Sequence, residues 1–383
     1  MILLSHPTVN AFNRALAEAL QRTDRLAGFH TTIALGRRAV ALPRAKLHLH
    51  PWREVARLAA QRLGWRDDLG ALGVDAVYRA LDAAVSRDLG DARAVYCYED
   101  GALATFHAAR ERGLPRLYEL PIAYWETTQR LLREEAARLP AWASTLQAPD
   151  DSAEKLARKT AELKLADLVV CPSRFVQSSL PPGTRSIVSE FGSPPLPGSL
   201  TPLRGDGPLR LLFAGTMSQR KGLADLFAAL RLLDRRDVEL SVLGTPLAPL
   251  SFYRDAWPHF RHESSRPHPQ VLALMDTCDV LVLPSIVEGR ALVQQEALSR
   301  GLPLLVTPNA GGEDLVVPGE TGWLVPIRDP EALAERIAWF AEHRGGLPAM
   351  REAAQRMAAA RSWEDYTRRI IAAIDVLCPS THE

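Results

Sequence analysis

Residues 281–298 limit the possible folds of this chain more than any other segment. The apolar run 281–283 ends at Pro284 and Ser285, and a helix-forming stretch follows after a short loop. A short apolar run of this kind is typical of a buried parallel strand that leads into a helix. Ligands of open α/β sheets bind outside the carboxyl ends of the strands. Glu288, in the loop, is therefore predicted to lie at a binding edge of a doubly wound sheet.

A second carboxylate, Glu296, follows eight residues after Glu288. We expect it about two turns into the helix, beside the apolar Leu292 and Val293, which lie one turn earlier. Burying a bare carboxylate costs several kcal/mol, so Glu296 is expected to have a partner. That partner is either a bound ligand or Arg300, one turn further along the helix.

A cationic turn precedes this segment. Residues 215–222 read Gly-Thr-Met-Ser-Gln-Arg-Lys-Gly and join a predicted strand at 209–214 to a predicted helix at 223–233. Glycine lets backbone amides approach an anion, and a helix amino terminus adds partial positive charge. Neither a Walker loop nor a G-x-G-x-x-G fingerprint is present. Diphosphate binding by Arg220 and Lys221 is predicted, and a basic surface pair is the alternative.

The order of these motifs resembles a known family. The two acids, preceded by 213–215 and 220–222 and followed by Gly311-Gly312 and 319–322, resemble the Glu-x7-Glu signature of retaining glycosyltransferases of the GT-B fold, glycosyltransferase family 4 in particular. The resemblance covers the chain from about residue 165 onward. It implies an α/β protein of GT-B architecture, with two Rossmann-like doubly wound domains that face a central cleft.

Two domains are also expected from the length of 383 residues, because single hydrophobic cores rarely grow this large. A Pro- and Gly-rich stretch at 190–207 reads as the linker. The expected domains are residues 1–195 and 207–360. The resemblance implies that the first binds the acceptor, that the second binds the nucleotide-sugar donor, and that a helix within about 361–383 crosses back onto the first.

The resemblance also implies roles for individual residues. Arg220 and Lys221 would hold the leaving diphosphate and Glu288 the hydroxyls of the donor sugar, and these three are the predicted catalytic residues. The remaining predicted donor contacts are Gly215, the backbone amides of Arg290, Ala291 and Leu292, and Glu296 toward the nucleotide ribose. Many family members have an aromatic residue and a glycine where this chain has Arg290 and Ala291. Arg290 would therefore tighten the sugar pocket or add a third cation.

The first domain offers weaker indications of an acceptor site. The candidates lie at or after the ends of predicted strands: His6, Asn10, Glu99, Asp100, Glu119 and Arg174. Loop acids in solvent, and a helix that Ser173 caps beside Arg174, are the structural alternatives. The lysines near 155–164 are expected on a solvated helix face. His48 and His50 would share one face of an extended segment, but without a third ligand they are interpreted as surface residues.

Composition excludes several classes of protein. A formal net charge of +1 argues against bulk nucleic-acid binding. Four cysteines without paired spacing predict free thiols, and no spacing of metal ligands is present. The amino terminus lacks the features of a signal peptide and no apolar run approaches about 18 residues, so a cytoplasmic protein is expected. Segment 127–145, with Leu131, Leu132 and Trp142, is predicted either to pack in a core or to touch the inner face of a membrane.

The hypothesis that follows is a metal-independent, retaining transferase without a cofactor, which moves a sugar from a nucleoside diphosphate to a hydroxyl acceptor. The acceptor is a glycan, a lipid-linked compound or a small molecule. One alternative is a nucleotide-sugar epimerase or phosphorylase on the same fold. The other is a non-catalytic sugar-nucleotide-binding protein.

Overall fold

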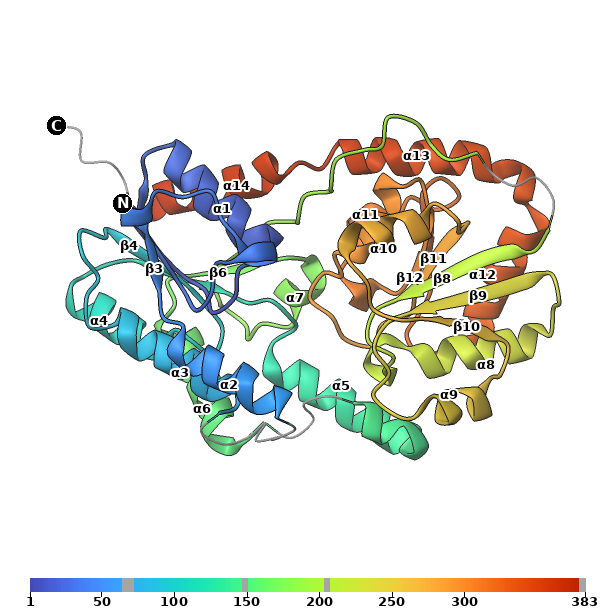
Figure 1. Cartoon of the computed structure of the whole chain (residues 1–383), viewed down its shortest axis with the longest axis horizontal. Helices are drawn as coiled ribbons and strands as arrows, with labels where there is room; N and C mark the ends of the chain where they lie inside the picture. Colours follow the sequence, from blue (N-terminus) through green and yellow to red (C-terminus); the bar gives the residue numbers. More distant parts are fainter. Residues whose placement is uncertain (64–71, 147–150, 203–206, 379–383) are drawn as a thin grey trace.

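The molecule contains two parallel β-sheets, which lie side by side along its long axis (Figure 1). The computed structural model describes residues 1–63, 72–146, 151–202 and 207–378. The strands of the first sheet are β1 (Ile2–Ser5), β2 (Leu26–Thr31), β3 (Leu47–Leu49), β4 (Ala94–Tyr98), β5 (Arg116–Glu119), β6 (Leu168–Cys171) and β7 (Ser186–Val188). Those of the second are β8 (Leu209–Ala214), β9 (Val238–Leu243), β10 (Phe260–Glu263), β11 (Val280–Leu283), β12 (Leu304–Val306) and β13 (Gly322–Leu324).

Helices cover both sheets. Around the first sheet lie α1 (Ala11–Arg22), α2 (Trp52–Arg62), α3 (Val74–Val85), α4 (Leu103–Glu111), α5 (Trp125–Arg138), α6 (Ala153–Leu165) and α7 (Arg174–Ser178). The second half contains α8 (Leu223–Leu233), α9 (Leu250–Ala256), α10 (His268–Met275), α11 (Val293–Ser299), α12 (Pro330–Glu342), α13 (Leu347–Ala359) and α14 (Trp363–Leu377). The predicted α/β class and GT-B architecture are confirmed.

The strand order places a ligand-binding edge in each domain. The first sheet runs β3-β2-β1-β4-β5-β6-β7 and the second β10-β9-β8-β11-β12-β13, with every pair parallel. In both sheets the order therefore reverses beside the first strand, between β1 and β4 and between β8 and β11. Ligands of such sheets bind at the carboxyl ends of the strands next to this reversal. The motifs at 215–222 and 288–296 follow β8 and β11, the two strands at the reversal in the second sheet.

Helix α14, within the segment 361–383, returns to the first domain. Ser362 caps it by accepting a hydrogen bond from the amide of Asp365 at 3.0 Å. Its apolar face, with Tyr366, Ile370 and Ile374, is buried in the core that also contains residues of β1, β4 and α1. Figure 1 shows α14 beside α1, on the domain that holds the amino terminus.

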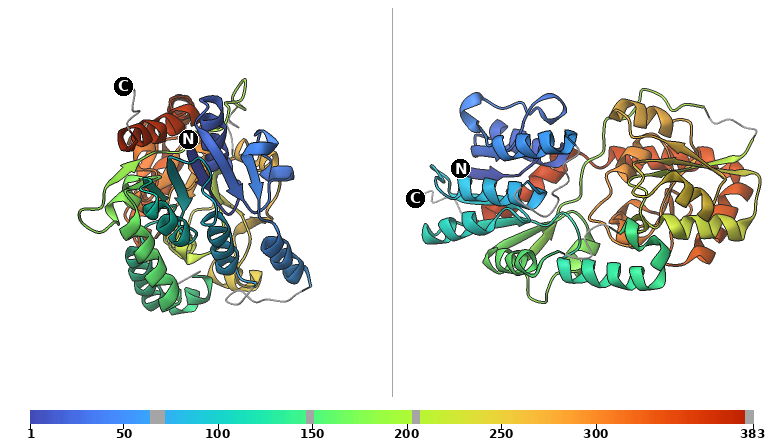
Figure 2. Two further views of the ribbon diagram at one scale, coloured as in Figure 1. Left: turned by 90° about the vertical axis from the view of Figure 1, so that its left-hand side faces the viewer. Right: turned by 60° about the horizontal axis from the view of Figure 1, so that its bottom comes forward.

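An arm of the first domain packs under the second. We call residues 125–145, which comprise α5 and the 3-10 helix η3 (Pro140–Thr145), the arm. Trp142 is 7% exposed and joins the core of the second domain, where its ring meets those of Phe252 at 4.8 Å and Tyr253 at 5.6 Å. The right view of Figure 2 shows α5 extending beneath that domain. Core packing, not a membrane surface, is thus the role of Trp142.

Two predicted element positions are wrong. The strand expected at 31–35 lies at Leu26–Thr31, where Gly28 weakened the sequence signal. A Cβ at Gly28 would lie 2.9 Å from the ring of the exposed His48, which would have to shift. Glu296 lies in the first turn of α11 and not two turns in, because the helix begins only at Val293.

The remaining predictions concern thiols and membranes. All four cysteines carry free thiols, as predicted, and Cys97, Cys171 and Cys278 are buried. Within the ranges given above, no helix combines the length and the apolar character needed to cross a membrane.

Candidate active site

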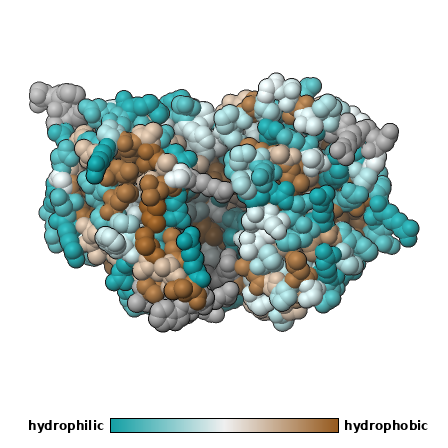
Figure 3. All heavy atoms as spheres, in the orientation of Figure 1, coloured by the Kyte–Doolittle hydropathy of each residue, from teal (hydrophilic) through white to brown (hydrophobic). Residues whose placement is uncertain are grey.

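A cleft of about 690 Å³ lies between the two domains. Its walls include the loops after β4 and β5 on one side, and the turn at 220–221 and the loop at 288–292 on the other. Figure 3 shows the hollow between the two lobes. A somewhat larger hollow, of about 810 Å³, lies beside the edge strand β10 and contains none of the predicted site residues. We place the candidate site in the interdomain cleft, where the predicted cations and acids meet.

Two cations converge on one carboxylate at the centre of this cleft. Arg220 Nη1 lies 2.7 Å from Glu288 Oε1, and Lys221 Nζ contacts the same oxygen. Arg220 also donates to the carbonyl of Val287 at 3.1 Å. Burial opposes ionisation of Glu288, but the charges of Lys221 and Arg220 outweigh it and lower its pKa. The cluster therefore carries an excess positive charge at neutral pH, which suits an anionic ligand.

Glycine packs the cationic turn against the neighbouring strand ends. Gly215 has φ +147°, and a Cβ there would lie 2.7 Å from Lys221 Cδ. Gly222 has φ +75°, and a Cβ there would lie 2.0 Å from the carbonyl oxygen of Pro284, just after β11. Larger residues would thus displace Lys221 or separate the turn from the loop that carries Glu288.

The arm holds the same turn from the other domain. The amide of Gln219 donates to Thr145 Oγ1 at 3.0 Å. Its side chain donates from Nε2 to Glu135 at 2.7 Å and to Asp225 at 2.9 Å. Gln219 Oε1 in turn accepts from the amide of Ala224 in α8, at 2.8 Å. Sequence reasoning missed this support, because Gln219 and Glu135 are 84 residues apart and neither lies in a recognisable motif.

The predicted third cation is engaged elsewhere. The Arg290 side chain is 0% exposed and pairs with both carboxylate oxygens of Asp314, at 2.6 and 3.0 Å. It also donates to the carbonyl of Gly311 at 3.0 Å. The amide of Ala291, predicted to cap phosphate, donates to the carbonyl of Ala310 at 3.2 Å, whereas Leu292 is the residue that precedes α11. Arg290 thus anchors the loop and contributes no charge to the cluster of Arg220 and Lys221.

Glu296 has a partner other than the one expected from helix spacing. Its carboxylate lies 3.0 Å from His268 Nε2, at the start of α10. Arg300 pairs instead with Asp276, at 2.7 Å, so the alternative ion pair within α11 is wrong. Burial raises the pKa of Glu296, and His268 partly offsets this. The pair with His268 places Glu296 next to the segment before α10.

The two domains touch directly beside Glu288. Ser173 Oγ donates to the carbonyl of Gly289 at 2.7 Å and also accepts from the amide of Val176, so it caps α7, which was the structural alternative for this segment. A Cβ on Gly289 would lie 1.6 Å from the carbonyl oxygen of Pro121. Only a residue without a side chain fits between these loops.

Gly289→Ala is therefore expected to separate the loops and displace Glu288. A displacement of about 1 Å at a reacting centre costs about 10²-fold in rate, and overpacking costs about 1–3 kcal/mol of stability. Steady-state kinetics and thermal unfolding measure both effects. Gly345→Ala is the matched control, because a Cβ there meets nothing within 4 Å. Equal behaviour of the two variants would show that the loop contact is not required.

Comparison with known proteins agrees with this geometry. Residues 202–360 match the model of the family described as glycosyl transferases group 1. The likeness to this family thus lies in the second domain of the chain. The matched segment contains the cationic turn, both acids and the glycine-rich segments that follow them.

Curated relatives of this group 1 domain match limited stretches. A putative colanic acid biosynthesis glycosyltransferase of Salmonella typhimurium is 31% identical over 146 residues, 35% of this chain and 36% of that protein. A glycogen synthase of Mycobacterium tuberculosis is 34% identical over 139 residues, 34% of this chain and 33% of that protein. The match thus spans about a third of the length of these relatives.

Solved structures match over nearly the whole chain. Sucrose-phosphate synthase from Thermosynechococcus elongatus superposes with a TM-score of 0.65 at 17% identity, over 98% of both chains. HepE of Anabaena, solved in complex with UDP and glucose, gives 0.64 at 16% identity, over 98% of this chain and 99% of that one. At these identities the likeness establishes the fold alone.

Three of the predicted acceptor residues line the cleft: Asn10, Glu99 and Asp100. Glu99 lies 3.1 Å from Lys159 Nζ, and Asp100 lies 3.4 Å from it. The predicted solvated face is wrong for Lys159, whose side chain is only 9% exposed, whereas Lys164 is exposed. Burial raises the pKa of Glu99, and the charge of Lys159 partly offsets this. Asn10 forms a capping box with Asn13, which begins α1.

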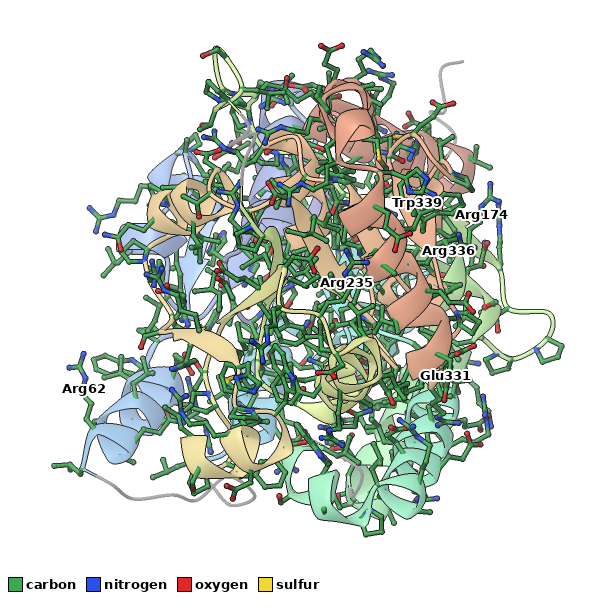
Figure 4. The ribbon with its side chains drawn as sticks, turned by 90° about the vertical axis from the view of Figure 1, so that its right-hand side faces the viewer. Arg62, Arg174, Arg235, Glu331, Arg336 and Trp339 are labelled. Carbon is green, nitrogen blue, oxygen red and sulfur yellow. The ribbon has the colours of Figure 1, made fainter. Side chains whose placement is uncertain are left out.

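The other three lie away from the cleft wall. His6 is 1% exposed behind Tyr98, with ring centroids 4.1 Å apart, and burial lowers its pKa to about 3. Glu119 borders a separate small cavity beside Tyr366. Arg174 is exposed and points into solvent at the edge of the molecule (Figure 4). Direct contact with a ligand in the cleft is thus not supported for these residues.

Glu119 provides a pH test of the fold. Burial raises its pKa from 4.5 to about 8. Between these values the folded chain keeps a proton that the unfolded chain loses, so stability falls as pH rises, by at most about 1.4 kcal/mol per pH unit. Glu119→Gln should therefore gain stability relative to the parent protein from pH 5 to 8 in urea unfolding. The exposed Glu126→Gln should not, and an equal pH dependence in both variants would contradict the assignment.

Proposed function

We propose that this chain is a retaining, metal-independent glycosyltransferase. It moves a sugar from a nucleoside diphosphate sugar to a hydroxyl of a glycan, a lipid-linked compound or a small molecule. The observation that carries the proposal is the convergence of Arg220 and Lys221 on Glu288, at the carboxyl edge of the second sheet and facing the first domain. The family match and the names of the relatives support the same class of reaction.

The two cations suit a departing diphosphate. When the bond between the anomeric carbon and the phosphate oxygen breaks, negative charge grows on that oxygen. Preorganised positive groups in a site from which water is excluded stabilise such charge strongly. Arg220 contributes a planar donor group and Lys221 a compact ammonium, and both are held in place by Glu288 and by the turn. These cations supply the charge that a divalent metal supplies in other transferases.

Glu288 takes two roles in this proposal. Without donor it neutralises part of the charge of both cations. With donor bound, the phosphates share the cations and the carboxylate accepts hydrogen bonds from hydroxyls of the sugar. The acceptor oxygen attacks the anomeric carbon on the face that the phosphate leaves, and its proton passes to the leaving phosphate oxygen. Configuration is thereby retained, and no protein base is needed.

The remaining donor contacts follow from the same loop. Glu296, paired with His268, is proposed to accept hydrogen bonds from the ribose of the nucleotide. The first domain, with Glu99 and Asp100 at the cleft, is proposed to bind the acceptor. We propose that the reaction takes place in the cytoplasm.

A screen of nucleotide sugars by thermal shift tests donor binding, since a ligand that binds the folded state raises the melting temperature. The best donor is then incubated, in radiolabelled form, with and without mixed acceptors and with EDTA. Transfer that requires acceptor, survives EDTA and retains the anomeric configuration by NMR supports the proposal. Conversion without acceptor indicates an epimerase, and tight binding without turnover indicates a binding protein.

A further inference from the structure

Helix α2 and the residue after it expose five apolar residues on the outside of the first domain. Trp52 and Leu63 are each 83% exposed and Val55 is 48% exposed, and Ala56 and Ala59 are exposed as well. These five residues, which we call the apolar stripe, recur at helical spacing and so share one face. A helix of a globular domain normally buries such a stripe against the core.

The side of α2 opposite the stripe carries a buried ion pair. Glu54 is 4% exposed and pairs with Arg57 at 2.7 Å and with Arg38 at 3.2 Å. Burial opposes its ionisation, but Arg57 and Arg38 outweigh this and lower the pKa of Glu54. A rotation that buried the stripe would break this buried ion pair, which is expensive. The helix is therefore fixed with its apolar stripe toward solvent.

The surroundings of the stripe are strongly basic. Residues 35–63 contain seven arginines and lysines and one acid, Glu54, in a chain whose net charge is only +1. Arg53 and Arg62 are exposed and flank the stripe on the helix. Figure 4 shows Arg62 pointing away from the molecule at the end of α2, and Figure 3 shows hydrophobic atoms gathered on the visible face of the first domain.

We propose that α2 binds the surface of an anionic lipid bilayer. The stripe would lie at the boundary between head groups and acyl chains, with Trp52 as the interfacial anchor. Arg62, exposed at the end of the helix, would contact lipid phosphates. Charge favours this partner over a second copy of the chain, since a two-fold contact through α2 would bring two identical basic surfaces together. The proposal does not depend on the enzymatic one.

Vesicle flotation tests this surface. The full chain is mixed with vesicles of phosphatidylcholine alone or with phosphatidylglycerol added. We expect binding only with the anionic lipid, and less of it at high salt because salt screens the attraction. Arg62→Ala should lower the partition coefficient about fivefold, since one cation near the surface contributes about 1 kcal/mol. Trp52→Glu should lower it about tenfold or more.

Leu232→Glu is the matched control, because Leu232 is 58% exposed on α8, in the other domain. It should float like the parent protein. Melting temperatures of all variants check that each is folded. Equal binding to neutral vesicles, or equal losses for Trp52→Glu and Leu232→Glu, would overturn the proposal. So would light scattering that shows a dimer which Trp52→Glu converts to a monomer, with no binding to either vesicle.

Discussion

Lys221→Ala is expected to lower kcat/KM for sugar transfer about 10²- to 10³-fold, the usual effect of removing one preorganised group that stabilises developing negative charge. Lys221 Nζ contacts Glu288, and the Lys221 side chain lies against Gly215. Arg220 keeps its own contact with Glu288, at 2.7 Å, and holds the loop in place. Melting temperature should therefore change little. Initial rates with radiolabelled donor measure the first effect and calorimetry the second.

Lys164→Ala provides the comparison for this variant, because Lys164 is an exposed lysine of α6 that lies outside the cleft. It should keep full activity. If Lys221→Ala retained activity within a factor of a few, the cationic turn would not be the diphosphate site. A matching loss of folded protein would point to a structural role instead.

Glu135→Ala is expected to lower the free energy of unfolding by about 3–5 kcal/mol, as for other broken buried ion pairs. The Glu135 side chain is 0% exposed and contacts Arg138. It accepts from Gln219 Nε2 and from Arg328 Nε, each at 2.7 Å. Its loss removes the buried carboxylate that joins the two domains, although Gln219 keeps Asp225 and Arg328 keeps Glu134 as partners. Chemical denaturation measures the change, and donor affinity should fall as Gln219 loosens the cationic turn.

Glu134→Ala, one residue earlier on the arm, isolates the effect of burial. Glu134 has similar cationic partners, Arg328 at 2.9 Å and Arg130 at 3.0 Å, but its side chain is 42% exposed. Exposed ion pairs contribute little to stability. Comparable destabilisation by both substitutions would mean that the buried network is not what joins the arm to the second domain.

The donor half of the site could be predicted because its signals are local. An apolar strand, a glycine where backbone packs closely, and a charged loop before a helix lie within a few residues of one another at 209–222 and 280–296. Parallel strands bring such loops to one edge. That rule predicts Glu288 at such an edge, whereas the shared site of Arg220, Lys221 and Glu288 was predicted from the resemblance to the GT-B family.

Contacts between distant residues could not be predicted in this way. Helix spacing suggested Arg300 as partner of Glu296, but His268 occupies that position, 28 residues away. His48 and His50 were interpreted without a third imidazole, yet the ring of His30 lies 4.4 Å from that of His48. The strand that carries His30 was itself misplaced. In each case the partner is determined by tertiary packing between residues that are far apart in the sequence. A single sequence does not show which residues pack together.

The arm also has a consequence for how this molecule can be divided. Trp142 comes from the first half of the chain, yet its ring completes the core around Phe227, Phe252 and Tyr253. A fragment that begins near residue 202 would lack Trp142. The place that its ring fills in this core would then be open to water. Chimaeras that exchange donor specificity among relatives should therefore carry residues 125–145 along with the carboxyl-terminal half, although the sequence places them in the other.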